Sequence, residues 1–320
     1  MASVTEARPR ESRGGRGDFD AIIIGAGFSG LYQLNCLRDR LGLNAVVVEK
    51  ADGVGGTWYW NRYPGARCDS ESHSYCYAFS NELAQEWEWS ERYPGHAEIR
   101  RYLNFVADKL DLKRDIRFGT EVSSATYDEA ANLWHVETKD GGRLSAKYLI
   151  TAVGCLSTAN VPKIPGLESF EGEWYHTGQW PHEGVDLTGK RVGQIGTGST
   201  GIQAAPVIAA EAKHLTVFQR TPNYSVPARN GPLSDEFKQY VRDNFDEILE
   251  IVQSTTNGHP FRIAERKLFD GSEEERQKIY EAAWEKGGRQ FRAACEDLLA
   301  STAASDTAKE LLCTSIRAVV

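Results

Sequence analysis

The sequence predicts an α/β protein built from two Rossmann-like dinucleotide-binding units with a helical insertion. Three observations predict this fold class. The apolar run at 19–24 leads directly into the glycine pattern GAGFSG, a second pattern GTGSTG follows the run KRVGQIG, and helical periodicity dominates after residue 224. We expect a disordered tail at 1–17, a first nucleotide domain at 18–155, a linker at 156–185, part of a second nucleotide domain at 186–228 and a helical domain at 229–320.

Composition excludes several classes of partner. The chain has 320 residues and a formal net charge of -8, so it has no basic surface for nucleic acid. No apolar run is long enough to span a bilayer, and the arginine-containing start lacks the apolar core of a signal peptide. The six cysteines form no C-x-x-C pair, which argues against a redox disulfide or a zinc site and favours a reducing cytoplasm.

The first glycine pattern joins a predicted strand to a predicted helix. Residues 19–24 read FDAIII, and the residues after the glycines place leucine at helical spacing. In such a unit Gly25 permits the tight turn, Gly27 lets the backbone approach a pyrophosphate, and Gly30 lets helix and strand pack closely. Alone, this pattern is a weak signal.

The next predicted strand, NAVVVEK, places an acid where a ribose is bound. Glu49 follows Gly30 by 49 - 30 = 19 residues, close to the roughly 20 expected for this acid. A carboxylate accepts hydrogen bonds from ribose hydroxyls and repels a 2′-phosphate. The first site is therefore predicted to take FAD or NAD.

The second unit repeats the spacing with the opposite charge. Gly196, Gly198 and Gly201 form the turn, and the residue at 220 - 201 = 19 is Arg220. A guanidinium can bind a phosphate through two hydrogen bonds, so Arg220 predicts NADP, with Thr221 as a neighbouring donor. The alternative is that Arg220 is a surface residue at a strand end. Two sites of opposite preference imply hydride transfer from NADPH to a flavin.

Between the two units, residues 116–154 are predicted to form a meander of short strands. A turn at Asp140, Gly141 and Gly142 separates them, and a buried strand ends at Gly154. This meander is expected to close the first nucleotide domain. Amphipathic helices are predicted beyond residue 224, because apolar residues of DEFKQYVRDNFDEILEIVQ fall on one helical face and the later segments continue the period.

The segment FEGEWYHTGQWP, residues 170–181, resembles a family fingerprint. It fits F-x-G-x-x-x-H-x-x-x-W-P of the Baeyer–Villiger monooxygenases through Phe170, Gly172, His176, Trp180 and Pro181. Residues 55–69, GGTWYWNRYPGARCD, resemble a second signature of that family. The resemblance runs from about residue 18 to 320 and is nearest the phenylacetone and steroid monooxygenase branch.

The resemblance implies cofactor contacts at named positions of this chain. The implied FAD contacts are Ser29, Glu49, Gly55, Gly56, Thr57, Trp58, Asp69, Tyr75 and Val122. The implied NADP contacts are Arg67, Cys68, Asp69, Thr197, Gly198, Ser199, Thr200, Gly201, Ile202, Gln203, Arg220 and Thr221. The resemblance also implies the reaction: NADPH reduces the flavin, dioxygen adds to give a C4a-peroxide, and this peroxide converts a ketone to an ester or lactone.

Two residues are candidates for the chemistry. In the family an arginine supports the peroxide and an aspartate matching Asp69 orients it; the alternative for Asp69 is a surface carboxylate in a simple turn. His176 could act as a base, since histidine titrates near neutral pH. We favour a structural or conformational role, because in the family this histidine ties the connector to the nucleotide domain, and no nucleophile or acid is beside it in the sequence.

The sequence leaves three other functions to consider. An N-hydroxylating or other flavin monooxygenase would lack the Trp-Pro ending of the fingerprint, which this chain has at Trp180 and Pro181. A thiol-disulfide reductase would need a C-x-x-C pair, which this sequence does not contain. A non-catalytic NADP-binding regulator would hold no flavin. The second unit has only two predicted strands, so the chain is expected to be a fragment that does not oxygenate ketones alone, with the supporting arginine beyond residue 320. The ketone, the regioselectivity and the oligomeric state stay open, and no protein partner is indicated.

Overall fold

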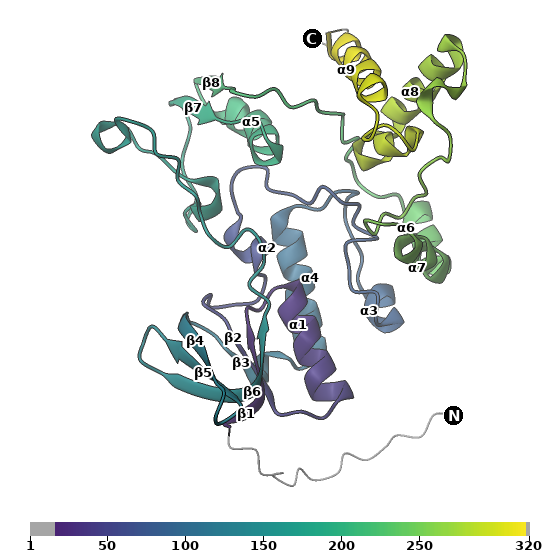
Figure 1. The fold of residues 1–320 in the computed structure, drawn as a ribbon. Coiled ribbons are helices and arrows are strands. Elements are labelled where there is room, and N and C mark those ends of the chain that lie inside the picture. Colours follow the sequence, from purple (N-terminus) through teal and green to yellow (C-terminus); the bar gives the residue numbers. More distant parts are fainter. Residues whose placement is uncertain (1–16, 318–320) are drawn as a thin grey trace. The chain divides into compact units, whose positions relative to one another are not determined.

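The structure is a computed structural model that describes residues 17–317, and the chain divides into two compact units (Figure 1). Unit 1 combines Met1–Asn61 with Arg100–Gln179, and unit 2 combines Arg62–Ile99 with Trp180–Val320. Residues 62–99, expected in the first nucleotide domain, therefore lie in unit 2, where they make hydrogen bonds to residues 203, 230–233 and 286–290. The predicted tail at 1–17, apart from Gly17, lies outside the described residues.

Unit 1 contains a six-stranded sheet with the order β3-β2-β1-β6-β5-β4. Strands β1, β2, β3 and β6 are parallel, whereas β4 and β5 run antiparallel to their neighbours. The elements of this unit are β1 (Phe19–Ile24), α1 (Phe28–Asn35), β2 (Ala45–Val48), α2 (Thr57–Trp60), most of α4 (His96–Lys109), β3 (Ile116–Arg117), β4 (Val122–Asp128), β5 (Leu133–Thr138) and β6 (Arg143–Thr151).

The central strands of this sheet are covered on both faces. The side chains of Ile22, Ile23 and Val47 are fully buried, which explains why the sequence of β1 is a continuous apolar run and does not alternate. Helix α1 packs beside α4, with the ring centroids of Phe28 and Tyr102 6.2 Å apart. The predicted meander is confirmed for β4, β5 and β6, with the turn between β5 and β6 at residues 139–142, whereas β3 pairs with β2. The expected buried strand ending at Gly154 was wrong: β6 ends at Thr151, and most of its residues are exposed or half-buried.

The helix after the first glycine turn is shorter than the leucine spacing predicts. Helix α1 ends at Asn35 and continues as a π-helical turn, Cys36–Arg40. Leu31 and Leu34 are fully buried, but Leu41 lies past the helix and is 65% exposed.

Unit 2 contains the second strand-helix-strand unit. It consists of β7 (Arg191–Ile195), α5 (Ser199–Glu211) and β8 (His214–Phe218), and the two strands form a parallel pair. Its core is formed by Tyr63, Ala66, Leu187, Ala204 and Ile208. The two strands expected here are confirmed.

The rest of unit 2 is helical. Its helices are α3 (Asn81–Glu86), α6 (Asp235–Asp243), α7 (Phe245–Ser254), α8 (Glu273–Lys286) and α9 (Thr302–Arg317). The single amphipathic pattern over 235–253 is divided at Asn244, whose backbone leaves the helical region. Helix α8 begins with a capping box, in which Ser272 accepts from Glu275 N–H and the Glu275 carboxylate accepts from Ser272 N–H.

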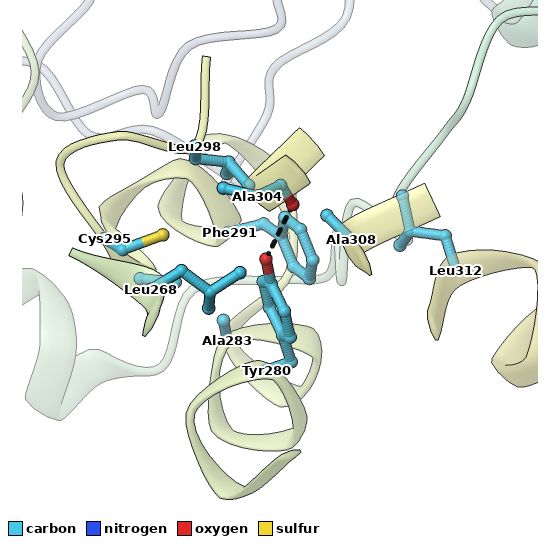
Figure 2. Packing of buried hydrophobic residues seen from close by; sticks show 10 residues of the cluster. Leu268, Tyr280, Ala283, Phe291, Cys295, Leu298, Ala304, Ala308 and Leu312 are labelled. Carbon is cyan, nitrogen blue, oxygen red and sulfur yellow. Dashed lines mark hydrogen bonds between the residues drawn. The ribbon is translucent and has the colours of Figure 1, made fainter. Parts of the chain in front are cut away.

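A local core holds α8 and α9 together (Figure 2). The rings of Tyr280 and Phe291 stack with centroids 5.7 Å apart, and the Tyr280 hydroxyl donates to the Ala304 carbonyl at 3.1 Å. Tyr280 is 1% exposed, so its hydroxyl needs this acceptor. Within residues 17–317, none of the helices combines the length and the apolar character that crossing a membrane requires.

Candidate functional site

The first glycine turn, between β1 and α1, has a backbone that only glycine accommodates. Gly25 has φ +105°, and a Cβ added at Gly30 would lie 1.8 Å from the Gly25 carbonyl oxygen. The extended residue Gly27 precedes the first residue of α1, Phe28, and no side chain caps the helix. The N–H groups at the start of α1 are therefore available to an anion.

The second predicted signature packs on this turn. Gly55 donates its N–H to the Ala26 carbonyl at 3.0 Å, and a Cβ at Gly56 would lie 2.8 Å from Gly27 Cα. Helix α2 then begins at Thr57, with Trp58 buried. Two motifs that are distant in the sequence thus meet at one place in unit 1.

Glu49 lies directly after β2 and is 5% exposed. Its Oε2 accepts from Ala26 N–H at 2.6 Å and its Oε1 accepts from Ala51 N–H at 2.8 Å. The carboxylate is thus fixed against the middle of the glycine turn. Each oxygen keeps a second lone pair, so a ribose hydroxyl can still donate to it.

The second glycine turn, in unit 2, repeats the same backbone geometry. Gly196 has φ +104°, and a Cβ at Gly201 would lie 2.4 Å from the Gly196 carbonyl oxygen. Gly198, like Gly27 in the first turn, is extended and precedes its helix. A Cβ at Gly198 would meet no described atom within 4 Å, so the middle of this turn faces open space.

Residues after β8 are tied to the second turn. Gln219 donates to Thr197 Oγ1 at 2.9 Å, and Asn223 donates to the Thr197 carbonyl at 3.0 Å. Arg220 and Thr221 lie between these anchors and are exposed. Within the described part of the chain, Arg220 makes no hydrogen bond or ion pair, so its guanidinium is available to a ligand.

Gln203, predicted to contact NADP, binds a neighbouring loop in the structure. Its Oε1 accepts from the Tyr63 hydroxyl at 2.8 Å and from Arg67 N–H at 3.3 Å. Its Nε2 donates to the Arg67 carbonyl at 3.1 Å and to Asp69 Oδ1 at 2.8 Å. The predicted residues Arg67 and Asp69 are therefore brought beside α5. Tyr63 was missed by sequence reasoning, although it lies inside the second signature.

The thiol of Cys68 is buried in this loop. Burial raises the pKa of Cys68 to about 11, although the Ser70 N–H bond to sulfur opposes this. The thiol stays protonated near neutral pH, and the exposed side chain that this loop presents beside it is Asp69.

These paired turns match a known family. The model of the flavin-binding monooxygenase-like proteins matches residues 20–236, more than half of the chain. The chain belongs to the flavin-binding monooxygenase-like family. Both glycine turns and the two charged residues that follow them lie inside the matched range.

Within this family, the chain is similar to Baeyer–Villiger monooxygenases. It is 46% identical over 95% of its length to a Baeyer–Villiger monooxygenase of Pseudooceanicola batsensis, and 42% identical over 93% to a phenazine N-monooxygenase of Lysobacter antibioticus. It also matches an oxidized steroid monooxygenase bound to NADP, with a TM-score of 0.89 and 50% identity over 94% of its length. The chain covers 56% of each of the two relatives and 58% of the steroid monooxygenase structure.

The remaining predicted residues of this flavin-binding monooxygenase-like chain are dispersed. Ser29 is exposed in the first turn of α1, and Val122 begins β4. Tyr75, in unit 2, donates its N–H to the Glu71 carbonyl at 3.1 Å. His176 belongs to unit 1, where its Nδ1 accepts from Gly178 N–H at 3.1 Å, a contact that orients the ring within its own segment.

Proposed function

We propose that this chain is the FAD- and NADPH-binding part of a Baeyer–Villiger monooxygenase, which uses dioxygen to convert a small ketone to an ester or lactone. The observation that carries the proposal is the repeated glycine turn with opposite charges after it. Gly25 and Gly196 share one backbone conformation, but Glu49 follows the first turn and Arg220 the second. Two turns of the same backbone geometry that are followed by residues of opposite charge favour two different nucleotides.

The first site suits FAD. The close packing of Gly56 on Gly27 keeps side chains away from the start of α1, where a pyrophosphate would bind backbone N–H groups. Glu49 would accept from the ribose and disfavour a 2′-phosphate. The further residues proposed to hold FAD are Gly25, Ser29, Gly30, Gly55, Thr57, Trp58, Asp69, Tyr75 and Val122.

The second site suits NADPH. The open space above Gly198 would admit the pyrophosphate, and the exposed guanidinium of Arg220 would bind the 2′-phosphate. The further residues proposed to hold NADPH are Arg67, Cys68, Asp69, Gly196, Thr197, Ser199, Thr200, Gly201, Ile202, Gln203 and Thr221.

When bound, NADPH would supply a hydride and FAD would accept it and activate dioxygen. The protein's own residues would orient the reacting groups and exclude water from them. Gln203 Nε2 donates to Asp69 Oδ1 at 2.8 Å and so fixes this carboxylate, which can orient a cation placed beside it. For His176 we propose a conformational role, because its observed contact is within its own segment and involves no acid.

A second function is favoured by one relative. The similarity to a phenazine N-monooxygenase makes oxygenation of an aromatic nitrogen an alternative use of the same two cofactors. We further propose a cytoplasmic location, which is supported by the free state of the six cysteines.

The test is purification followed by assay. We expect the purified chain to carry flavin absorbance and to bind NADP⁺. The complete product of the gene, given NADPH, should convert members of a ketone panel to esters, measured by gas chromatography. N-oxides from aromatic nitrogen compounds without any ester would favour the second function, and a colourless protein without flavin would contradict both.

A further inference from the structure

A buried carboxylate lies two residues after Asp69, and the nucleotide sites proposed above do not use it. Glu71 is 5% exposed. Its Oε1 accepts from Arg92 Nε at 2.8 Å, from Arg92 Nη2 at 2.5 Å and from Gln290 Nε2 at 2.8 Å. Burying a carboxylate is costly unless it is paired and hydrogen-bonded in this way.

The partners of Glu71 connect three separate segments of unit 2. Backbone hydrogen bonds of 2.8 to 3.0 Å join residues 66–72 to residues 92–96. Arg92 also donates its N–H to the Gly231 carbonyl at 3.0 Å and its Nη1 to the Lys286 carbonyl at 2.8 Å. The Glu71 cluster, defined as Glu71, Arg92 and Gln290, therefore fixes the loop 66–72 to the helical part of unit 2.

The same loop is also fixed to the second nucleotide-binding unit. Gln203, on α5, donates to Asp69 Oδ1 at 2.8 Å and to the Arg67 carbonyl at 3.1 Å. Arg67 and Asp69 thus stand between α5 and the Glu71 cluster. A loop that is anchored on one side only would let these side chains drift from the nucleotide site.

We propose that Glu71 is a positioning residue for the NADP site. Its carboxylate, held by Arg92 and Gln290, fixes the loop so that the side chains of Arg67 and Asp69 stay beside Gln203. Their position therefore depends on the segment 286–290. Glu71 itself is not among the residues proposed to hold FAD or NADPH. The inference rests on the proposed function, because NADP⁺ binding is its principal readout.

A matched control is available in the same unit. Glu98 is 7% exposed, and its carboxylate accepts from Ser90 N–H at 2.8 Å and from Ser90 Oγ at 2.7 Å. Glu98 is therefore about as buried as Glu71 and is also hydrogen-bonded, but its partner is the neutral Ser90, which is outside the loop 66–72. A general loss of stability should be common to both glutamate variants, whereas a positioning effect should be confined to Glu71.

The experiment is a calorimetric titration of the purified chain with NADP⁺. Glu71→Gln should weaken binding at least about fivefold, and Glu98→Gln should change it by less than about twofold. In a background that carries both Arg67→Ala and Asp69→Asn, Glu71→Gln should cause no further loss, because it acts through these two residues. Amide exchange of residues 66–72 should rise in Glu71→Gln and stay unchanged in Glu98→Gln.

Equal effects of the two glutamate variants on affinity, or a further loss from Glu71→Gln in the background altered at Arg67 and Asp69, would overturn the proposal. Should Glu71→Gln fail to fold, Gln290→Ala removes one donor from the cluster and decides the question: weakened binding supports the proposal and unchanged binding refutes it. If the unaltered chain did not bind NADP⁺, the proposed function would fail. Amide exchange at 66–72 would then still show whether Glu71 fixes the loop.

Discussion

At the scale of single residues, Gly198 and Gly201 belong to the same turn but meet different surroundings. A Cβ at Gly198 would enter open space, whereas one at Gly201 would lie 2.4 Å from a carbonyl oxygen. Gly198→Ala should therefore keep the free energy of unfolding and weaken NADP⁺ binding about tenfold, since the methyl group would occupy the place proposed for the pyrophosphate. Gly201→Ala should lower the free energy of unfolding by about 1–3 kcal/mol.

Chemical denaturation and calorimetry on the two variants measure these effects separately. The two glycines control for one another, because the same atoms are added at each. A Gly198→Ala protein that binds NADP⁺ as tightly as the original would show that the pyrophosphate does not lie over this turn.

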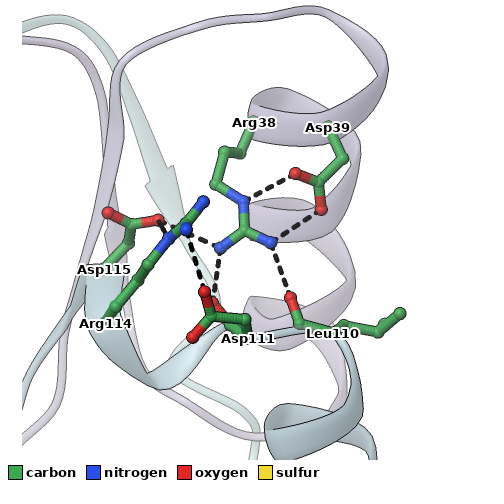
Figure 3. Close-up of polar contacts among 6 residues, drawn as sticks. All are labelled: Arg38, Asp39, Leu110, Asp111, Arg114 and Asp115. Atoms are coloured by element: carbon green, nitrogen blue, oxygen red, sulfur yellow. Dashed lines mark hydrogen bonds and ion pairs between the residues drawn. The ribbon is translucent and has the colours of Figure 1, made fainter. Parts of the chain in front are cut away.

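Arg38 is a second residue whose effect can be foreseen (Figure 3). Its side chain is 5% exposed in the π-helical turn after α1, and it donates to the carbonyls of Leu110 and Asp111, each at 2.7 Å. It also pairs with Asp115 at 3.0 Å. Arg38→Met leaves the carbonyls of Leu110 and Asp111 without this donor and removes the ion pair with Asp115, so unfolding should become easier by about 1–3 kcal/mol.

Arg101, an exposed arginine on α4, is the control for this substitution. Arg101→Met should change the free energy of unfolding by less than about 0.5 kcal/mol. Equal thermal melts for the Arg38 and Arg101 variants would mean that the π-helical turn does not depend on its hydrogen bonds to residues 110–115.

At the scale of elements, the β7–β8 pair differs from the six-stranded sheet of unit 1. Ile195 is 70% exposed and Phe218 56% exposed, whereas Ile22 and Ile23 of β1 are fully buried. A two-stranded sheet has few neighbours to resist opening. Amides of β7 and β8 should therefore exchange with deuterium at least about tenfold faster than those of β1. Similar protection of the two sheets, seen by mass spectrometry, would contradict this.

The sequence was sufficient for elements whose signals are local. The apolar run of β1, the two glycine turns and the helix α5 follow from residues that are close in the chain. The division at Asn244 and the early end of α1 at Asn35 were not predicted, because leucine or phenylalanine spacing continues across both points while the backbone changes. Periodicity reports which residues can be buried, and tertiary packing decides where a helix ends.

The candidate site shows the same limit. The distances of 19 residues to Glu49 and Arg220 could be read from the sequence, since they reflect one helix and one strand. The bonds of Gln203 to Tyr63 and Asp69, and the bond of Gln290 to Glu71, join residues more than a hundred positions apart. No spacing rule predicts such contacts. The assignment of residues 62–99 to unit 2 has the same cause.

For the whole molecule, the proposed function requires two nucleotide-binding units with opposite selectivity. Unit 1 carries a buried acid beside its glycine turn, and unit 2 carries an exposed guanidinium near its own. FAD has no 2′-phosphate and NADPH has one, so the proposed function attributes the selectivity of the two turns to this difference in charge.

The most direct test of this claim is the preference for NADP⁺ over NAD⁺, measured by calorimetric titration of the original chain and of Arg220→Gln. The substitution would remove the charge-assisted hydrogen bonds proposed for the 2′-phosphate. Affinity for NADP⁺ should therefore fall about 10- to 100-fold, while affinity for NAD⁺ stays the same. An unchanged preference for NADP⁺ in Arg220→Gln would contradict it.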